Sequence, residues 1–567
     1  MYKPNDYYNL IHMVKGKCYK MKITYFNKTV EYSKPIKLSS LLDEKNTKYL
    51  AAKVNNRIRE LDYVVSEDAV VDFLDITNRE AMNIYQSTLR YAIVMAIKRR
   101  FKNAKVIFNY SISRSIFASV SGLKGAFKAE HLKEIEEELQ NIIKADYPIK
   151  RSTVTKDFAR NYFKEQRYYD KEKILKYRKE DTVHLYTCEE YANYMFGYML
   201  PSTRYLTSYI LRLYSPGFII QYPRSECGGI IPPFEDAPTF SLALKEANIW
   251  GNISKCSSIP QMNEIIEAKK AVELINLCET KHNNMLAELG MKIKENIDDI
   301  RLIAIAGPSS SGKTTFTNRL RIELMSRGIT PLMISIDNYY LGISKAPKDE
   351  NGEPDLEHIN ALDIKLFDKN INDLINGEEV ELPIFNFETA TREHGPVVKL
   401  MENQPIMIEG IHALNDSLTP SIPLHKKFKI YISPQAQLHI DDHNPISLSD
   451  IRLIRRIVRD HQFRNYNAAK TIAIWPSVRR GEFKWIYPYQ ENANYVFNSE
   501  LSYELCVFKK YLIPLLEEIK PDSEYYITAN RLIKFMKYFH DIDDKWIPCN
   551  SILREFIGGS MFYDANE

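Results

Sequence analysis

A glycine- and serine-rich segment at residues 307–314 has the composition and spacing needed to bind phosphate. It reads GPSSSGKT and fits the pattern G-x-x-x-x-G-K-[ST] without a mismatch. Glycines let the backbone wrap around phosphate oxygens with successive N–H groups pointing inward, and a following helix adds the positive end of its dipole. An apolar run at 302–306 precedes the segment, and a helical pattern follows from Thr314 to Ser326. We therefore expect ATP or GTP to bind here.

The residues of this loop have separate expected roles. Lys313 would reach the β- and γ-phosphates, and the hydroxyl of Thr314 is placed to ligate Mg²⁺. The full set expected to bind the nucleotide is Gly307, Ser309, Ser310, Ser311, Gly312, Lys313, Thr314 and Thr315. The alternative is a serine-rich turn that binds nothing, which the strand before it and the helix after it disfavour.

Two carboxylates follow apolar runs that read as strands. Asp337 comes after the run 332–336, and Glu409 comes after Ile406-Met-Ile. The carboxyl ends of strands form the rim where ligands bind in α/β folds. Asp337 could there accept a proton from a substrate hydroxyl, although an aspartate that caps a helix is the alternative. Glu409 has the Walker-B arrangement, which holds the hydration shell of Mg²⁺.

A stretch that reads IRLIRRIVRD places four arginines on one face of a predicted helix. These are Arg452, Arg455, Arg456 and Arg459, at positions i, i+3, i+4 and i+7. Four stacked guanidinium groups repel one another unless an anion lies nearby, and a solvated basic face is the alternative. Arg464, just beyond, would join the cluster on a mobile lid.

The order of four motifs along the chain, and the spacing between them, resemble the uridine kinase and phosphoribulokinase group of P-loop kinases. The motifs are GPSSSGKTT, DNYY, IEGI and RRIVRD. The resemblance implies transfer of a phosphoryl group from ATP, with Mg²⁺, to the 5′-hydroxyl of a nucleoside. It implies that Asp337 is the general base and that Thr314 and Glu409 position Mg²⁺. The other catalytic residues that it implies are Lys313, Arg459 and Arg464, and the substrate contacts are Glu357, Phe385, Arg456 and Tyr339.

The base pocket departs from the pattern of uridine kinases. Where that group has a tyrosine and a histidine that read the pyrimidine, this chain has Phe385 and Ala390. Phe385 can stack on a base but lacks the hydroxyl, and the side chain of Ala390 cannot form a hydrogen bond. The residues of this chain therefore support the chemistry of a nucleoside kinase more strongly than they support specificity for uridine. A purine nucleoside or another sugar alcohol stays open as the acceptor, as does GTP as the donor.

The chain before residue 236 resembles parts of threonyl-tRNA synthetases. Within a predicted β-grasp domain at 1–75, residues 19–75 are similar to a TGS domain, and residues 76–235 are similar to the α+β editing domain. The four positions that hold metal in that domain are occupied here by Gln86, Arg90, Met195 and Met199. None is a normal Zn²⁺ ligand, so we expect no editing chemistry and no zinc.

Short apolar runs that alternate with helical patterns predict the organisation of the remaining chain. Residues 299–520 should form an α/β domain with a parallel sheet and helices on both faces. A helical linker is expected at 236–298, including one helix over 264–297, and a C-terminal helical extension at 521–567. The order TGS-like, editing-like and kinase-like is that of a family of bacterial nucleoside kinases, and the resemblance to this family spans nearly the whole chain.

The chain of 567 residues has a net charge of +4, but its charged residues are unevenly distributed. Residues 1–230 contain 39 Lys and Arg against 26 Asp and Glu, an excess of +13, and the remainder carries −9.

The stretch from Lys144 to Lys179 mixes basic residues with Tyr and Phe, a composition that suits RNA binding. A solvated amphipathic helix is the alternative, and so is a surface that forms oligomers. A regulatory protein that binds tRNA, with the kinase fold as a nucleotide sensor, is therefore the second hypothesis.

Other features bear on location and metals. Seven scattered cysteines without a CxxC pair fit a reducing cytosol, and no run of about 18 apolar residues predicts a membrane span. We expect a cytoplasmic homo-oligomer that acts on a nucleoside.

His439 and His443 are spaced i, i+4 but lack the glutamate of HExxH, so we interpret this stretch as a loop near the lid rather than a metal site.

Overall fold

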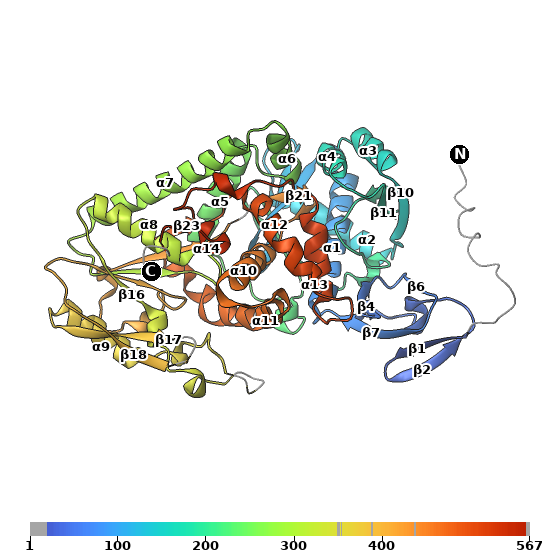
Figure 1. Ribbon diagram of the computed structural model, residues 1–567. Coiled ribbons are helices and arrows are strands. Elements are labelled where there is room, and N and C mark those ends of the chain that lie inside the picture. Colours follow the sequence, from blue (N-terminus) through green and yellow to red (C-terminus); the bar gives the residue numbers. More distant parts are fainter. Residues whose placement is uncertain are drawn as a thin grey trace.

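The computed structural model describes residues 20–348, 352, 354–386, 389, 391–435 and 438–562 (Figure 1). Three expectations fall wholly or partly outside these residues. They concern Ala390 in the predicted base pocket, residues 1–19 of the predicted first domain, and residues 563–567 of the predicted C-terminal extension.

Five parallel strands form the centre of the C-terminal part. Their order is β16–β19–β15–β20–β23, and every neighbouring pair is parallel. The bounds are β15 Leu302–Ala306, β16 Leu332–Ser335, β19 Ile406–Glu409, β20 Lys427–Ser433 and β23 Tyr495–Asn498. The predicted α/β domain with a parallel sheet is confirmed.

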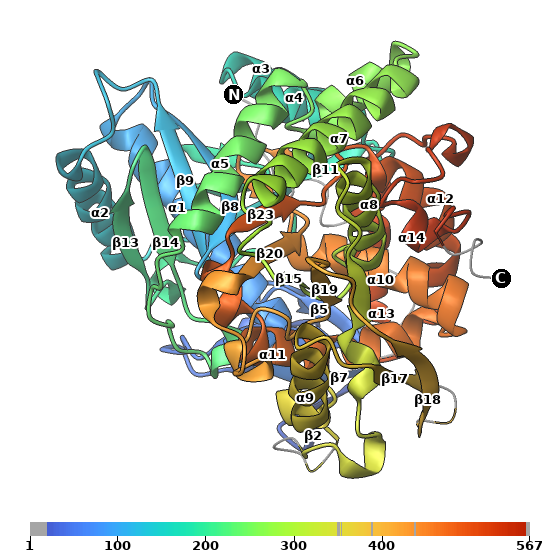
Figure 2. The same cartoon turned by 90° about the vertical axis from the view of Figure 1, so that its left-hand side faces the viewer.

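Helices cover both faces of this sheet. Ile303 and Ile305 pack into one core with α7 (Ala271–Glu295), α8 (Lys313–Ser326) and α10 (Leu448–Arg464). Leu302 and Ala304, which alternate with them, pack on the other face against α9 (Ile364–Ile375). Side chains on both faces are buried, which explains why the strand is apolar throughout. Figure 2 shows α7 and α8 side by side, in green, along the sheet.

A mixed sheet opens the described chain, with strand order β2–β1–β7–β4–β5. β1 is parallel to β7, and the other pairs are antiparallel. The bounds are β1 Met21–Tyr25, β2 Lys28–Tyr32, β4 Tyr49–Val54, β5 Arg57–Arg59 and β7 Ala69–Asp75, with a separate pair β3 Ile36–Lys37 and β6 Val64–Val65. The TGS-like identity of this unit stays a prediction.

The next part combines helices with two antiparallel sheets of orders β13–β14–β9–β8 and β10–β11–β12. The strands of the first are β8 Lys105–Ile112, β9 Ser115–Ser121, β13 Ile210–Tyr214 and β14 Gly217–Gln221. Those of the second are β10 Lys150–Thr155, β11 Thr182–Cys188 and β12 Tyr191–Asn193. The helices are α1 Arg79–Arg100, α2 Ala129–Lys144, α3 Lys156–Glu165 and α4 Tyr169–Lys176.

Two helical interpretations of the sequence differ from the structure. The stretch 144–179, for which a single amphipathic helix was the alternative to an RNA-binding surface, holds a strand and two short helices, because β10 pairs with β11 and Thr155 then caps α3 by accepting from the N–H of Phe158. The expected helix over 264–297 is divided into α6 (Ile259–Glu267) and α7 by Lys269, whose φ of 59° lies in the left-handed region.

The predicted linker is part of the core. It contains α5 (Pro238–Ile253), α6 and α7. One apolar cluster combines Phe163 and Leu185 of the N-terminal part with Leu289 of α7 and Leu453 of α10. The two parts therefore share buried surface.

The C-terminal helices are α11 Ala468–Trp485, α12 Glu504–Glu517, α13 Tyr526–Met536 and α14 Arg554–Ile557, and α14 packs against α10. The remaining strands are β17 Val380–Asn386, β18 Thr391–Val398, β21 His439–Asp441 and β22 Asn444–Pro445. Within the described ranges, no helix has the length and apolar character needed to cross a membrane.

Candidate functional site

The predicted phosphate loop joins β15 to α8 and is strongly curved. Ser310 and Gly312 have positive φ angles of 59° and 89°. A Cβ at Gly312 would lie 2.5 Å from Cγ2 of Ile552, so the close packing also requires glycine. Lys313 Nζ donates to the carbonyl oxygen of Gly307 at 3.0 Å. The loop thus surrounds the N-terminus of α8, where backbone N–H groups favour an anion.

Hydroxyl groups in the loop are free to bind a ligand. The side-chain oxygens of Ser310, Ser311 and Thr315 are buried, and none has a hydrogen-bond partner among the described residues. Buried polar atoms are normally paired, so these three hydroxyls and the helix N-terminus fit a triphosphate. Mg²⁺ that is bound with a nucleotide needs only one or two protein groups, such as Thr314 and Glu409.

Three carboxylates meet near Lys313 at the carboxyl edge of the sheet. Asp337 lies in a 3₁₀ turn directly after β16, Glu409 ends β19, and Glu357 lies in the long connection to α9. Burial raises the pKa of Asp337, and Lys313 and Arg464 oppose the shift. Burial and then Asp337 raise the pKa of Glu409 to about 7.

Glu357 is held at this edge by α11. Burial raises its pKa, and Arg456 and Lys313 oppose the shift. A Cβ at Gly481 of α11 would lie only 2.5 Å from Cβ of Glu357. The absence of a side chain at Gly481 therefore lets Glu357 approach the other acids.

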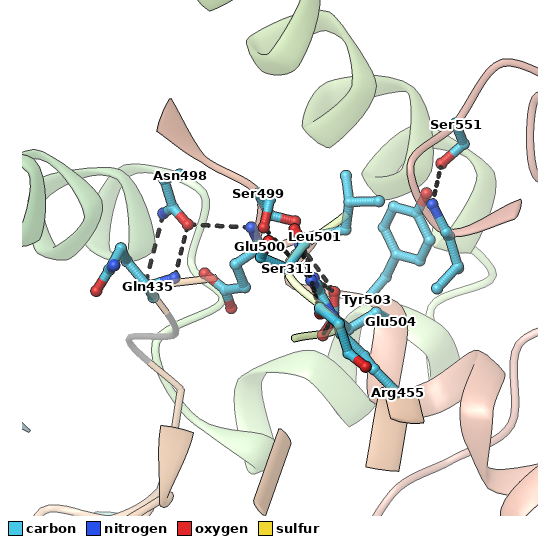
Figure 3. A network of polar contacts seen from close by, with 12 residues as sticks. Ser311, Gln435, Arg455, Asn498, Ser499, Glu500, Leu501, Tyr503, Glu504 and Ser551 are labelled. Carbon is cyan, nitrogen blue, oxygen red and sulfur yellow. Dashed lines mark hydrogen bonds and ion pairs between the residues drawn. The ribbon is translucent and has the colours of Figure 1, made fainter. Parts of the chain in front are cut away.

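Two of the four α10 arginines pair with carboxylates and donate to carbonyl oxygens of the phosphate loop. This corrects the expectation that the four guanidinium groups are stacked without counter-ions. Arg455 is fully buried; its Nε donates to Glu504 at 2.9 Å, and its Nη1 reaches the carbonyl oxygen of Ser311 at 3.4 Å (Figure 3). Arg452 likewise forms an ion pair with buried Glu482, and its Nε donates to the carbonyl oxygen of Ser309 at 3.0 Å. Carboxylates therefore remove the expected repulsion.

The remaining arginines of the cluster gather on one buried acid, Asp460. It accepts from Arg456 Nε at 3.1 Å and from Arg459 Nη2 at 2.6 Å, and Arg464 Nε lies 3.7 Å away. Arg456 Nη1 also donates to the hydroxyl of Ser309 at 2.7 Å. Sequence reasoning missed Asp460, although its place in RRIVRD, four residues after Arg456, is a usable signal.

The structure corrects the expected role of Tyr339 in substrate binding. Tyr339 is 0% exposed, packs on the ring of Phe367 at 4.8 Å, and accepts a hydrogen bond from Asn370. Tyr340 faces the acids instead: burial, Asp337 and Glu357 raise its pKa. Its ring lies 5.8 Å from that of Phe385, the other predicted substrate contact. The 3₁₀ turn Ile336–Tyr339 decides which of the two adjacent tyrosines is buried, and no sequence pattern indicates this choice.

A residue of the C-terminal segment reaches the phosphate loop. Glu555 of α14 is buried, and its Oε2 accepts from the N–H of Thr315 at 3.0 Å. Its charge also contributes to the raised pKa of Glu409. The two partners are 240 positions apart in the sequence, so no local motif indicates this contact.

Among the described residues, no group of three or more His, Cys, Asp or Glu side chains is arranged to hold a metal ion. His443 is buried beside Asn193, with Nδ1 3.0 Å from its amide nitrogen. His439 Nδ1 lies 3.0 Å from the carbonyl oxygen of Ser257. This stretch packs in the interior, which corrects the expectation of a loop near the lid.

The parallel sheet, the loop and the carboxylates at the strand ends define a P-loop kinase fold. The phosphoribulokinase / uridine kinase family matches residues 302–502. A protein named uridine kinase from Ligilactobacillus salivarius is 33% identical over 171 residues, which cover 30% of this chain and 71% of that protein. Another, from Ureaplasma parvum, is 29% identical over 194 residues, or 34% of this chain and 85% of that protein. The chain belongs to the phosphoribulokinase and uridine kinase family.

A third relative has a different name. The threonine–tRNA ligase of Desulforamulus reducens is 30% identical over 160 residues, which cover 28% of this chain and 25% of that protein. This similarity agrees with the predicted synthetase-like domains but covers only a quarter of the ligase, so their identity stays a prediction.

Proposed function

We propose that the chain is a nucleoside kinase that transfers a phosphoryl group from ATP, with Mg²⁺, to the 5′-hydroxyl of a nucleoside. The observation that carries the proposal is the position of Asp337, Glu409 and Lys313, which lie together where β16, β19 and β15 end. This arrangement gives a proton acceptor, a group for the metal and a cation for the phosphates in one place. Membership of the family supports the same reaction class.

The chain's own residues supply positioning and charge. Asp337 accepts the proton of the attacking hydroxyl, and burial raises its pKa, which makes the carboxylate a stronger base. Lys313 and the loop N–H groups hold the phosphates, while Arg459 and Arg464, oriented by Asp460, neutralise the transferring group. Bound ATP with Mg²⁺ supplies the phosphoryl group, and its bond to the leaving diphosphate breaks as the new ester bond forms.

The nucleoside would lie between the acids and the aromatic pair. Glu357 and Arg456 are placed for ribose hydroxyls, and Tyr340 and Phe385 offer ring faces for the base. The relatives named uridine kinase support uridine as a substrate to test first. Phe385 cannot read a base through a hydroxyl, so we expect weaker discrimination between bases than such a hydroxyl would give.

A panel of ribonucleosides tests the proposal. The full chain is incubated with ATP or GTP, with and without Mg²⁺, and release of the nucleoside diphosphate is followed. We expect Mg²⁺-dependent release with at least one nucleoside, and loss of release in Lys313→Met but not in Lys348→Met, which changes an exposed lysine. No nucleoside-dependent release with either donor would refute the proposal.

A further inference from the structure

A second cavity, of about 610 Å³, lies between the N-terminal part and α13. Its described lining includes residues of β5, α1, β10 and α13 and none of the phosphate loop. Nine basic side chains line it, among them Arg59 and Arg90. Only three acidic side chains do so: Glu80, Glu180 and Asp450. The cavity therefore carries a strong excess of positive charge.

Arg90 is a buried arginine of this cavity that forms no ion pair among the described residues, and the charges of Tyr222 and Asp441 offset only part of the effect of burial on its pKa. Its residue is 6% exposed, and its Nη2 donates to the hydroxyl of Ser87 at 3.2 Å. Its Nε has no partner among the described residues, and no carboxylate of these residues forms an ion pair with it. Burial lowers the pKa of Arg90 to about 10. A buried guanidinium without a carboxylate is costly, and an anion that enters the cavity would remove that cost.

Further donors and ring faces surround the same space. Arg59 Nη1 donates to the hydroxyl of Tyr198 at 3.2 Å, while the buried Nε of Arg59 has no partner among the described residues. Tyr198, Phe196 and Tyr538 also line the cavity. A guanidinium group can bind a phosphate through two parallel N–H···O hydrogen bonds, and aromatic rings stack on bases.

We propose that this cavity is a second ligand site, which binds a nucleoside phosphate. The volume is that of a pocket for a small ligand, the excess of basic residues calls for a polyanion, and the rings suit a planar base. Arg90 would contact the phosphates. The site is separate from the phosphate loop and does not depend on the reaction proposed there.

The test uses the full chain with Lys313→Met, which weakens nucleotide binding at the loop, and calorimetric titration with ATP, GTP, CTP, UTP and pyrophosphate. We expect at least one nucleotide to bind more tightly than pyrophosphate. Adding Arg90→Met should weaken that binding at least tenfold, whereas Arg212→Met, which changes an exposed arginine of β13, should leave it unchanged. Binding that is equal in all three proteins would overturn the proposal.

Two further results would also overturn it. One is binding of a single-stranded oligoribonucleotide but of no mononucleotide, which would assign the cavity to RNA. The other is a lower melting temperature for Arg90→Met without ligand, which would give Arg90 a structural role. Because removing an unpaired buried charge relieves its cost, we expect an unchanged or higher melting temperature.

Discussion

At the scale of single residues, we expect Glu500 to make the stability of the fold depend on pH. It lies just after β23, where burial and then Glu504 raise its pKa to about 8, against the opposing charges of Arg455 and Lys281. The folded state therefore holds this proton more tightly than the unfolded chain. The resulting stability is complete below the ordinary pKa of 4.5 and is lost progressively as the pH rises to 8.

The variant Glu500→Gln should remove this titration. We expect the free energy of unfolding to exceed that of the wild type at pH 8 by on the order of 2 kcal/mol, and to differ little at pH 5. Denaturant unfolding at both pH values measures the difference. Glu518→Gln, an exposed change on the segment after α12, should have no such effect. An equal gain at both pH values would contradict the account.

The sequence predicted residues whose place follows from strand ends and motif spacing. The proximity of Lys313, Asp337 and Glu409 could be predicted from the rule that the carboxyl ends of parallel strands lie at one edge of a sheet. Tyr339 was misassigned because a local turn, and not the motif, orients the side chain. Asp460 was missed although its i, i+4 spacing from Arg456 on one helix could have predicted the pair.

At the scale of elements, α14 places a negative charge next to the phosphate loop. Glu555 accepts from the N–H of Thr315, which lies in the first turn of α8, where a phosphate would bind. Its carboxylate should repel the triphosphate. We therefore expect Glu555→Gln to lower the dissociation constant of ATP about threefold to tenfold.

Calorimetric titration with ATP checks this change, with Asp543→Asn as a control on the same C-terminal segment. Its side chain is 48% exposed and pairs with Lys545. An unchanged or higher dissociation constant for Glu555→Gln would show that the carboxylate aids binding or is neutral to it.

Elements were predictable where local pattern and tertiary context agreed. The strand at 302–306 and the helix that follows it were predicted within one residue of β15 and α8. The break between α6 and α7 was missed because the apolar spacing continues through Lys269 in its left-handed conformation. The strand β10 was missed because pairing with β11 overrides a basic, helix-like composition.

At the scale of the whole molecule, a buried ion pair joins the two parts of the chain. Lys171 of α4 and Asp441 of β21 are both fully buried, with Nζ and Oδ1 2.8 Å apart. Asn444 Nδ2 donates to the other carboxylate oxygen at 2.7 Å. The pair fixes the N-terminal part against the kinase part, so the uneven charge of the sequence does not imply two independent bodies.

Breaking this pair should destabilise the whole chain. Lys171→Met leaves the charge of Asp441 buried alone, so we expect a loss of about 3 kcal/mol or more in the free energy of unfolding. The double variant Lys171→Met/Asp441→Leu should recover most of the loss. Denaturant unfolding measures both variants. A single variant as stable as the wild type would show that the pair does not join the parts.

Asp337→Asn tests most directly whether this site catalyses phosphoryl transfer. The amide keeps the shape of the side chain but cannot accept the proton of the hydroxyl, so we expect nucleoside-dependent release of ADP to fall about 10³-fold. The dissociation constant of ATP should change little, because Lys313 and the loop N–H groups hold the phosphates. Asp373→Asn serves as the control; this aspartate lies on α9 and pairs with Lys369, and its side chain is 19% exposed. Near-normal turnover of Asp337→Asn would contradict the account.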